Sequence, residues 1–153
     1  MMSIPLFKST LKLIQKIIAR RKYLYYGFGL ATFYPIFVLS FVWWHCYQSP
    51  FKGGTNGPLD AYRHTLASAV VAYTTSPKLV EITTFWMESK NQPANLMDQH
   101  NNAIGAKIGS NANAFSSLPS IVTAQILHGK INASNPNQIT FLPKSWWKDS
   151  VFW

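Results

Sequence analysis

Two short polar segments hold most of the residues in this chain that are suited to acid–base or metal chemistry. The first, NGPLDAYRH, contains an aspartate and a histidine four residues apart, Asp60 and His64. On a helix these two side chains share one face, where the carboxylate can accept a hydrogen bond from the imidazole and raise its basicity. A structural interpretation competes with this one, because Asp60 in a first helical turn complements the helix dipole and Arg63 is placed to pair with it.

The second segment, MDQHNNAIG, gathers a carboxylate, two amides and a glycine at helical spacing: Asp98, Asn101, Asn102 and Gly105. Adjacent asparagines form helices poorly, so this stripe favours contact with a partner rather than with water. Gly105 would cost a helix about 1 kcal/mol relative to Ala, which indicates that another helix or a ligand approaches closely there. Buried amides need polar partners, and we expect the ionisable residues of the first segment to supply them.

Together the two segments resemble an uncharacterised bacterial domain of exported and toxin-like proteins. The resemblance covers residues 56–129 and rests on NGPLDAYRH, a Ser-Ala pair beginning at Ser68, an acidic residue at Glu88, and MDQHNNAIG. It implies that seven residues belong to one site, namely Asp60, Arg63, His64, Glu88, Asp98, Asn101 and Asn102. The family commonly has a histidine before the acidic residue, and this chain has Met87 there, which weakens any role that needs a second imidazole.

These residues predict a hydrolase that acts on a cell-envelope substrate, either peptidoglycan or lipid. His64 would serve as the general base or acid, and Asp60 or Asp98 would orient it. Arg63 and one of the two asparagines of the second segment would stabilise the negative charge that develops during the reaction. The two segments contain no serine elbow and no reactive cysteine, so an activated water is expected rather than a covalent intermediate.

Two other interpretations stay open on the sequence alone. In a metal-dependent version of the enzyme, the ligands of a divalent ion would be His64, Asp60, Glu88 and Asp98. His100 would lie about 200° around its helix from Asp98, so the two would not easily share an ion. Alternatively, the chain is a non-catalytic binding or immunity-like protein, tethered to a membrane, whose buried polar network fixes its helix packing. A cleft that opens His64 to water would favour chemistry, and a sealed contact would favour structure.

Helices must position both segments, and the chain after residue 57 is predicted to be mainly α-helical. Proline and glycine at the ends of the apolar segments mark where each helix starts or stops. We expect an exported domain over 58–153 with four helices, one beginning at Pro58 and the others at about 78–89, 94–108 and 119–128. The first helix has a core face at Leu59, Tyr62, Leu66, Val70 and Tyr73. A short irregular or β segment follows, and then a tryptophan-rich end with Trp146, Trp147, Phe152 and Trp153.

A membrane-spanning helix is predicted before this domain, over residues 23–44. These 22 residues carry no charge, and at about 1.5 Å per residue they span roughly the 30 Å hydrocarbon core of a bilayer. Aromatic residues flank both ends, with Tyr23, Tyr25 and Tyr26 at one and Trp43, Trp44 and Tyr47 at the other. A cleaved signal peptide is the alternative, but the apolar run is too long and no small-residue cleavage site follows it. Residues 45–57 are then a linker.

The distribution of charge predicts an orientation in the membrane. Of the 14 Lys and Arg residues, six lie in the first 22 positions, which contain none of the 5 acidic residues. Positively charged flanks stay in the cytoplasm, so we expect a single-pass inner-membrane protein whose C-terminal domain is periplasmic or extracellular. The basic segment 1–22 would be an amphipathic helix on the inner membrane surface or a soluble extension of the anchor.

The charge limits the expected partners, and the cysteine content limits the kinds of site that the chain can form. The folded part has no basic stripe with interleaved aromatics, so nucleic acid is not an expected partner, whereas membrane lipid and an envelope substrate are. The one cysteine, Cys46, excludes a disulfide within the chain and a zinc site built on cysteines.

Overall fold

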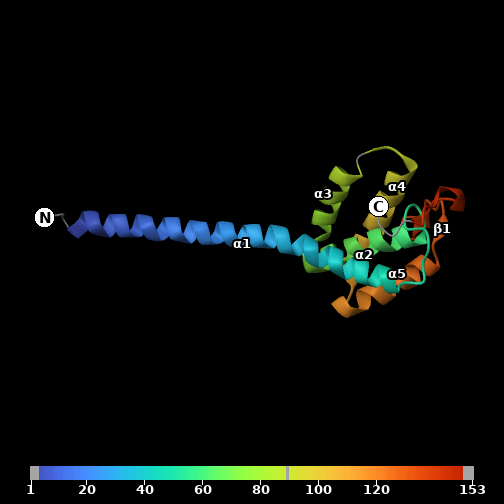
Figure 1. The fold of residues 1–153 in the computed structure, drawn as a ribbon, viewed down its shortest axis with the longest axis horizontal. Helices are drawn as coiled ribbons and strands as arrows, with labels where there is room; N and C mark the ends of the chain where they lie inside the picture. The colour runs from blue at the N-terminus through green and yellow to red at the C-terminus, as the bar shows by residue number, and fades with distance from the viewer. Residues whose placement is uncertain (1–3, 89, 150–153) are drawn as a thin grey trace. The chain divides into compact units, whose positions relative to one another are not determined.

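The computed structural model describes residues 4–88 and 90–149, and this part of the chain is mainly helical, as predicted. Its elements are α1 (Ile4–Gln48), α2 (Pro58–Thr74), α3 (Pro77–Met87), α4 (Pro93–Asn111), α5 (Leu118–Leu127), β1 (Lys130–Ile131) and β2 (Thr140–Phe141), shown in Figure 1. Single 3-10 turns lie at Phe115–Ser117 and Lys144–Trp146. The chain divides into two compact units, Met1–Phe37 and Val38–Trp153, which are described separately.

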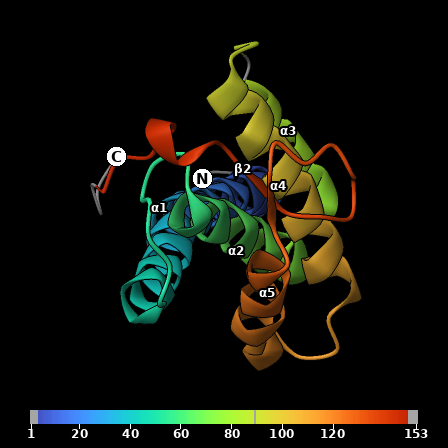
Figure 2. The ribbon, with the colours of Figure 1, turned by 90° about the vertical axis from the view of Figure 1, so that its right-hand side faces the viewer.

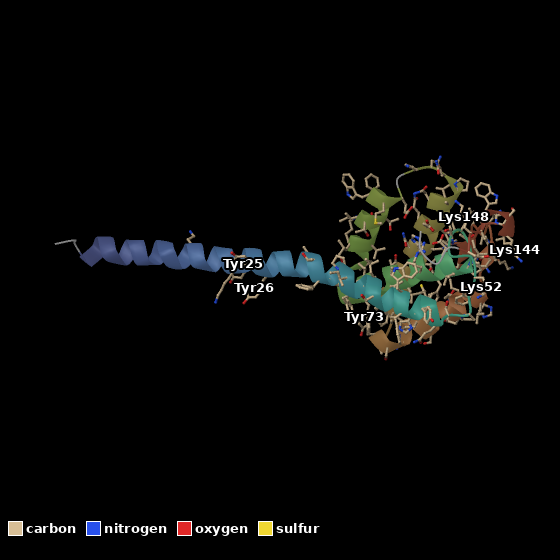
Figure 3. The ribbon with its side chains drawn as sticks, viewed as in Figure 1. Tyr25, Tyr26, Lys52, Tyr73, Lys144 and Lys148 are labelled. Carbon is tan, nitrogen blue, oxygen red and sulfur yellow. The ribbon has the colours of Figure 1, made fainter. Side chains whose placement is uncertain are left out.

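The first unit consists of the greater part of α1, in which the basic segment continues into the apolar run as one helix. Tyr25–Gln48 is long and apolar enough to cross a membrane, with a mean hydropathy of 1.5, and lies slightly later in the chain than the predicted 23–44. Tyr25 and Tyr26 project outward from the helix (Figure 3). The amphipathic pattern expected in 1–22 rests on Leu6, Leu11, Ile14, Ile17 and Ile18, whose side chains lie outside those that the structure describes.

The last turns of α1 belong to the second unit. Val38, Val42 and Cys46 recur every four residues along one face of the helix, and all three are buried. The helix therefore continues to Gln48, and the connection to α2 is shorter than the linker expected at 45–57. This buried stripe is hidden in the sequence because most residues around it are also apolar or aromatic.

The second unit is built around α2, which packs against α3, α4 and α5. The last turns of α1 lie on the side of α2 away from α4 (Figure 2). Pro58 opens the helix directly after its N-cap residue Gly57, a position where the missing N–H of proline is not needed. Tyr62, Leu66 and Val70 are buried, as their spacing predicted, whereas Leu59 is half-buried and Tyr73 at the end of the helix is exposed. The core of the unit therefore lies along the length of α2.

Helix α4 packs closely against α2 at two glycines. A Cβ atom at Gly105 would collide with the carbonyl oxygen of Thr65, and one at Gly109 would collide with that of Ala69. The two backbones approach this closely because neither glycine has a side chain. This contact confirms the prediction that another helix approaches Gly105, and it sets which residues of α4 face α2.

Asn101 of α4 holds the short β-ribbon in place. β1 and β2 pair in parallel after α5. The Asn101 side chain donates from Nδ2 to the carbonyl oxygen of Thr140 (2.8 Å) and accepts at Oδ1 from the N–H of Thr140 (3.1 Å). One amide thus satisfies both backbone groups of a residue in β2, which a buried strand requires.

The tryptophan-rich end is attached to the loop that precedes α2. The N–H of Leu142 donates to the carbonyl oxygen of Asn56 (2.9 Å), and Asn56 Nδ2 donates to that of Trp146 (3.1 Å). The indole of Trp147 donates to the carbonyl oxygen of Leu142 (2.7 Å). This end therefore fixes Asn56, whose backbone is in the left-handed region with φ 63°. Phe152 and Trp153 lie outside the described residues.

Candidate functional site

The α2–α4 contact brings the two polar segments together. Asp60 and His64 lie one turn apart on α2, and Asp98 of α4 faces them. Nε2 of His64 lies 3.5 Å from Oδ1 of Asp60 and 3.7 Å from Oδ1 of Asp98. One ligand atom from each of the three residues lies within 4.8 Å of the others, so within the described part of the chain they form a group that could hold a metal ion.

Both carboxylate oxygens of Asp60 have fixed partners. Oδ2 accepts a hydrogen bond from the N–H of Asn56 (2.5 Å), and Oδ1 is paired with the guanidinium of Arg63. Arg63 also donates to the carbonyl oxygen of Gly54 (3.1 Å), and its guanidinium carbon lies 5.6 Å from the ring centre of Trp43. Asp60 therefore has the ion-pair partner that the structural interpretation expected, in addition to the neighbouring histidine.

Burial and nearby charge give Asp98 and His64 unusual protonation states. Burial raises the pKa of Asp98 to about 8, and the negative charges of Asp60 and Glu88 add to this rise, while Arg63 opposes it. Burial lowers the pKa of His64 below its ordinary value of 6.5, although Asp60 opposes that change. At neutral pH the imidazole is therefore uncharged and the carboxyl group holds a proton. Oδ1 of Asp98 is buried and has no hydrogen-bond partner among the described residues.

A pocket of about 400 Å³ opens beside these side chains, within the range of about 300–1,000 Å³ that is typical of small-molecule sites. Its polar lining consists of Arg63, His64, Ser68, Glu88, Asp98 and Asn102, together with Thr83 and Thr84. Its apolar lining consists of Leu39, Val42, Trp43, Ala67, Val71, Val80 and Met87. The His64 side chain is 21% exposed, so His64 lies at a cleft rather than in a sealed contact.

Glu88 and Asn102 also reach this pocket, as the resemblance implied. Glu88 is the C-cap residue of α3, and its carboxylate accepts a hydrogen bond from Nδ2 of Asn95 (2.8 Å). Asn102 accepts at Oδ1 from the hydroxyl of Ser68 on α2 (2.8 Å). Six of the seven expected residues therefore lie in or directly beside one site.

Asn101 is the exception. It is fully buried, and its side chain forms hydrogen bonds with Thr140 rather than with the ionisable residues of the first segment. Adjacent residues on a helix point about 100° apart, so Asn101 and Asn102 do not share a partner. His100 is also turned away, with Nε2 lying 2.8 Å from the carbonyl oxygen of Gln138.

Two further residues contribute to the site, and one of them, Trp43, lies outside the polar segments. Trp43 was expected only as an aromatic residue at a membrane boundary, yet it stacks on Arg63 and lines the pocket. Asn56 is the first residue of the segment NGPLDAYRH, and its N–H orients the carboxylate of Asp60. The spacing of Val38, Val42 and Cys46 matches their burial against the domain, but the apolar residues around them mask this spacing in the sequence.

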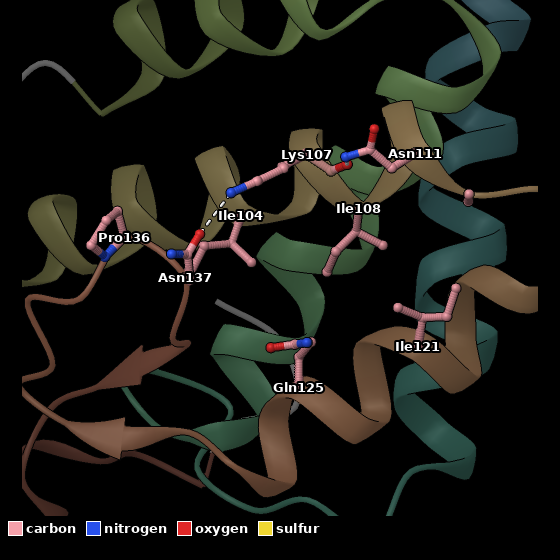
Figure 4. Close-up of a pocket in the computed structure, with 9 residues that line it drawn as sticks. Ile104, Lys107, Ile108, Asn111, Ile121, Gln125, Pro136 and Asn137 are labelled. Carbon is pink, nitrogen blue, oxygen red and sulfur yellow. Dashed lines mark hydrogen bonds between the residues drawn. The ribbon is translucent and has the colours of Figure 1, made fainter.

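A second groove, of about 330 Å³, lies between α4 and α5 and is separate from this site (Figure 4). Ile104, Ile108 and Ile121 form much of its lining, and Lys107 donates from Nζ to Oδ1 of Asn137 (2.7 Å) along its edge. Its lining residues include neither a histidine nor a carboxylate, so this groove offers no acid–base pair.

Comparison with known proteins covers the same part of the chain. Residues 45–135 match the family described as "Domain of unknown function (DUF6973)", and this match spans more than half of the 153 residues. It contains α2 to α5 and all seven residues of the predicted site. Neither a curated protein nor a solved structure matches the chain. Because this match covers more than half of the chain, the chain belongs to the DUF6973 family.

Proposed function

We propose that this protein is a membrane-anchored hydrolase of the cell envelope, in which His64 is the general base and Asp98 the general acid. The proposal rests on one observation: an uncharged imidazole and a protonated carboxyl group line the same pocket, with Nε2 and Oδ1 3.7 Å apart. Surroundings that shift the pKa values of two neighbouring groups in this manner provide a base and an acid at neutral pH.

The reaction would be the hydrolysis of a carbonyl compound by an activated water. The water gives a proton to His64 while its oxygen attacks the carbonyl carbon, and the carbonyl electron pair moves onto its oxygen. When that pair returns, the bond to the leaving group breaks and Asp98 gives its proton to the leaving atom. His64 has gained one proton and Asp98 has lost one, so transfer of a proton from the imidazolium to the carboxylate restores both groups.

Two fixed charges assist this chemistry. Oδ1 of Asp60 lies 3.5 Å from Nε2 of His64 and favours the imidazolium that forms. Arg63 supplies a positive charge beside the pocket, where it stabilises the negative charge on the carbonyl oxygen. Asp60 cannot easily move, because both of its oxygens are already bound, so its role is positioning rather than proton transfer.

A metal-dependent reaction is the competing chemistry, because ligand atoms of Asp60, His64 and Asp98 converge. The guanidinium of Arg63 on Oδ1 of Asp60 opposes this alternative. A cation bound to that oxygen would lie next to a fixed positive charge and would be repelled by it. Acid–base catalysis therefore agrees better with the contacts of Asp60.

The envelope location is supported by two features of the N-terminal part. Tyr25–Gln48 is long and apolar enough to cross a membrane, and the residues before it are basic. By the positive-inside rule the basic end stays in the cytoplasm of the inner membrane, and the domain faces the periplasm or the exterior. The substrates within its reach are then peptidoglycan and membrane lipid.

The test compares two histidine substitutions in the full-length protein in detergent micelles. Purified peptidoglycan and envelope phospholipid are offered separately, and products are identified by mass spectrometry. His64→Ala should lower the rate by about 100-fold or more. His128→Ala is the matched control, because His128 is exposed at the end of α5 and outside the pocket, and it should leave the rate unchanged.

Chelation separates the two chemistries. A rate that survives EDTA supports the acid–base assignment, and a rate that EDTA abolishes and added divalent ions restore would replace it with the metal-dependent reaction. If His64→Ala is folded and as active as the parent, or if the parent hydrolyses neither substrate, the non-catalytic binding protein becomes the better interpretation.

A further inference from the structure

We propose that the substrate of this site is a membrane phospholipid, whose acyl chain enters the pocket from the bilayer between the end of α1 and α3. The proposal rests on the hydrolase function above and narrows its substrate to lipid. Three observations support it: the origin of the pocket wall, the exposed surface of α3, and the distribution of charge over the second unit.

One wall of the pocket comes from the helix that is able to cross a membrane. Leu39, Val42 and Trp43 line the pocket, and all three lie within Tyr25–Gln48. Val80 and Met87 of α3 contribute apolar lining from the other side. A hydrocarbon chain is the part of an envelope molecule that such a lining removes favourably from water, whereas the sugars and peptides of peptidoglycan are polar.

Helix α3 presents an exposed apolar surface beside this wall. Val80 is the one residue of α3 that is buried. Five large apolar side chains of the helix are exposed to a considerable extent: Leu79 (37%), Ile82 (46%), Phe85 (70%), Trp86 (75%) and Met87 (76%). Exposed apolar patches of this kind mark contacts with membranes or proteins, and Trp is enriched where protein meets the membrane–water interface.

The exposed face of α3 lies next to the apolar wall of the pocket. Within the second unit, α3 runs across the direction of the last turns of α1 rather than along it (Figure 1). Residues of α3 and of the helix that is able to cross a membrane line the same pocket. A bilayer is therefore favoured over a protein partner as the occupant of the exposed face of α3.

The charged residues of the second unit are distributed unevenly between its two ends. Lys52, Lys144 and Lys148 lie together at the end of the unit opposite to α3, whereas Tyr73 lies at the same end as α3 (Figure 3). Lys78 and Glu81, the two charged residues within α3, pair with each other (2.7 Å). The two charges within α3 therefore neutralise each other, and Lys90, which is exposed just beyond the end of the helix, has a stem long enough to keep its ammonium group among the lipid headgroups.

The chemistry follows from this placement. With an acyl chain along the apolar wall, its ester group lies toward His64 and Asp98 on the polar wall. Water adds to the ester carbonyl carbon, the bond between that carbon and the glycerol oxygen breaks, and the glycerol oxygen takes the proton of Asp98. The products are a fatty acid and a lysophospholipid, and no further reactant is needed.

The first experiment measures lipid contact independently of catalysis. The full-length protein is placed in nanodiscs of phosphatidylethanolamine and phosphatidylglycerol, with a photoreactive leucine analogue at Met87 or, as the control, at Gln125 in the separate groove of Figure 4. Illumination should attach phospholipid acyl chains at position 87 and not at position 125. Equal labelling at the two positions, or none at 87, would overturn the proposal.

The second experiment measures hydrolysis of the same lipid in nanodiscs and of a soluble short-chain phospholipid. The double variant F85S/W86S removes two exposed side chains of α3, and L127S is the control because Leu127 is 68% exposed on α5. The double variant should lose about tenfold or more of the rate on nanodisc lipid, since that interfacial contact is lost. Its rate on the soluble substrate should stay within about twofold of the parent, because the site itself is intact.

The outcomes separate this proposal from the one on which it depends. Labelling at position 87 without hydrolysis of either lipid refutes the hydrolase function and leaves the lipid contact standing. Hydrolysis of peptidoglycan, with no labelling at 87 and no attack on phospholipid, refutes the lipid substrate and leaves the hydrolase standing. Equal rates of the parent and the double variant on nanodisc lipid refute the role given to α3.

Discussion

Replacing Asp98 with asparagine should make the protein more stable at alkaline pH and change its stability little at acid pH. Burial raises the pKa of this carboxyl group from 3.8 to about 8, so between these values the folded protein keeps a proton that the unfolded chain has released. In that range the unfolded state binds fewer protons, and the free energy of unfolding therefore falls as the pH rises. Asparagine has no proton to lose, so the variant should not show this fall.

The size of the effect follows from the shift in pKa. A difference of about 4 pKa units at about 1.4 kcal/mol each sets an upper limit of about 6 kcal/mol near pH 9. Entry of water and movement of Glu88 or Arg63 would reduce it, so we expect a gain of about 2–5 kcal/mol. Near pH 5, only about one unit above the ordinary pKa of 3.8, the same arithmetic gives at most about 2 kcal/mol, so the difference between the two proteins should be much smaller there.

The assay is urea denaturation in detergent micelles, followed by tryptophan fluorescence at about pH 5 and about pH 9. Protonation of His64 in the unfolded chain lowers the stability of both proteins below about pH 6.5, because burial lowers its pKa in the folded state, and this effect cancels when the two are compared. Hydrolysis at neutral pH should be lost in the variant, which lacks the general acid. Parallel stability curves for parent and variant across this pH range would refute the raised pKa of Asp98.

Other predictions follow from the same contacts. The rate of hydrolysis by the parent should rise as the pH rises through the lowered pKa of His64 and fall above about 8 as Asp98 loses its proton; a flat profile would contradict both roles. Gly105→Ala should cost about 3 kcal/mol in urea denaturation because its Cβ would meet Thr65, whereas Gly27→Ala, with no atom within 4 Å of the new Cβ, should cost nothing. Asn101→Ala should lower the free energy of unfolding by about 2–3 kcal/mol, because both backbone groups of Thr140 lose their partner. At low temperature the folded variant should still hydrolyse substrate. A variant as stable as the parent would show that these two hydrogen bonds contribute little. A periplasm-active reporter fused after Trp153 should be active and one fused before Met1 silent, and the reverse pattern would place the domain in the cytoplasm.

The helices and their contact were predictable because their signals are local. Pro58 and Pro77 begin helices at the positions where proline is tolerated, and the apolar spacing along α2 matches its buried face. Gly105 was informative because a glycine inside a helix is costly unless a close approach requires it. Two motifs with unusual polar residues then indicated which faces meet, and the pocket lies at that meeting.

The remaining features depend on parts of the chain that have no periodic pattern. Asn101 and Asn102 are neighbours of the same type, and their different roles depend on where β2 lies, which the sequence around Thr140 does not indicate. The last turns of α1 carry an apolar run suited to a membrane and a narrow buried stripe at once, and hydrophobicity alone cannot separate the two. The protonation of Asp98 depends on burial, which follows only from the assembled helices.

The boundaries of the family match and those of the folded unit are not the same. The match ends at residue 135 and begins at 45, so it omits the buried Val42 and the partner of Asn101, Thr140. A fragment cut at those limits would expose an apolar groove on α2 and leave a buried amide without its bonds. The matched region is thus completed in this chain by the sequences on both sides of it. Expression of the second unit by itself should therefore start at or before Val38 and continue through Lys148.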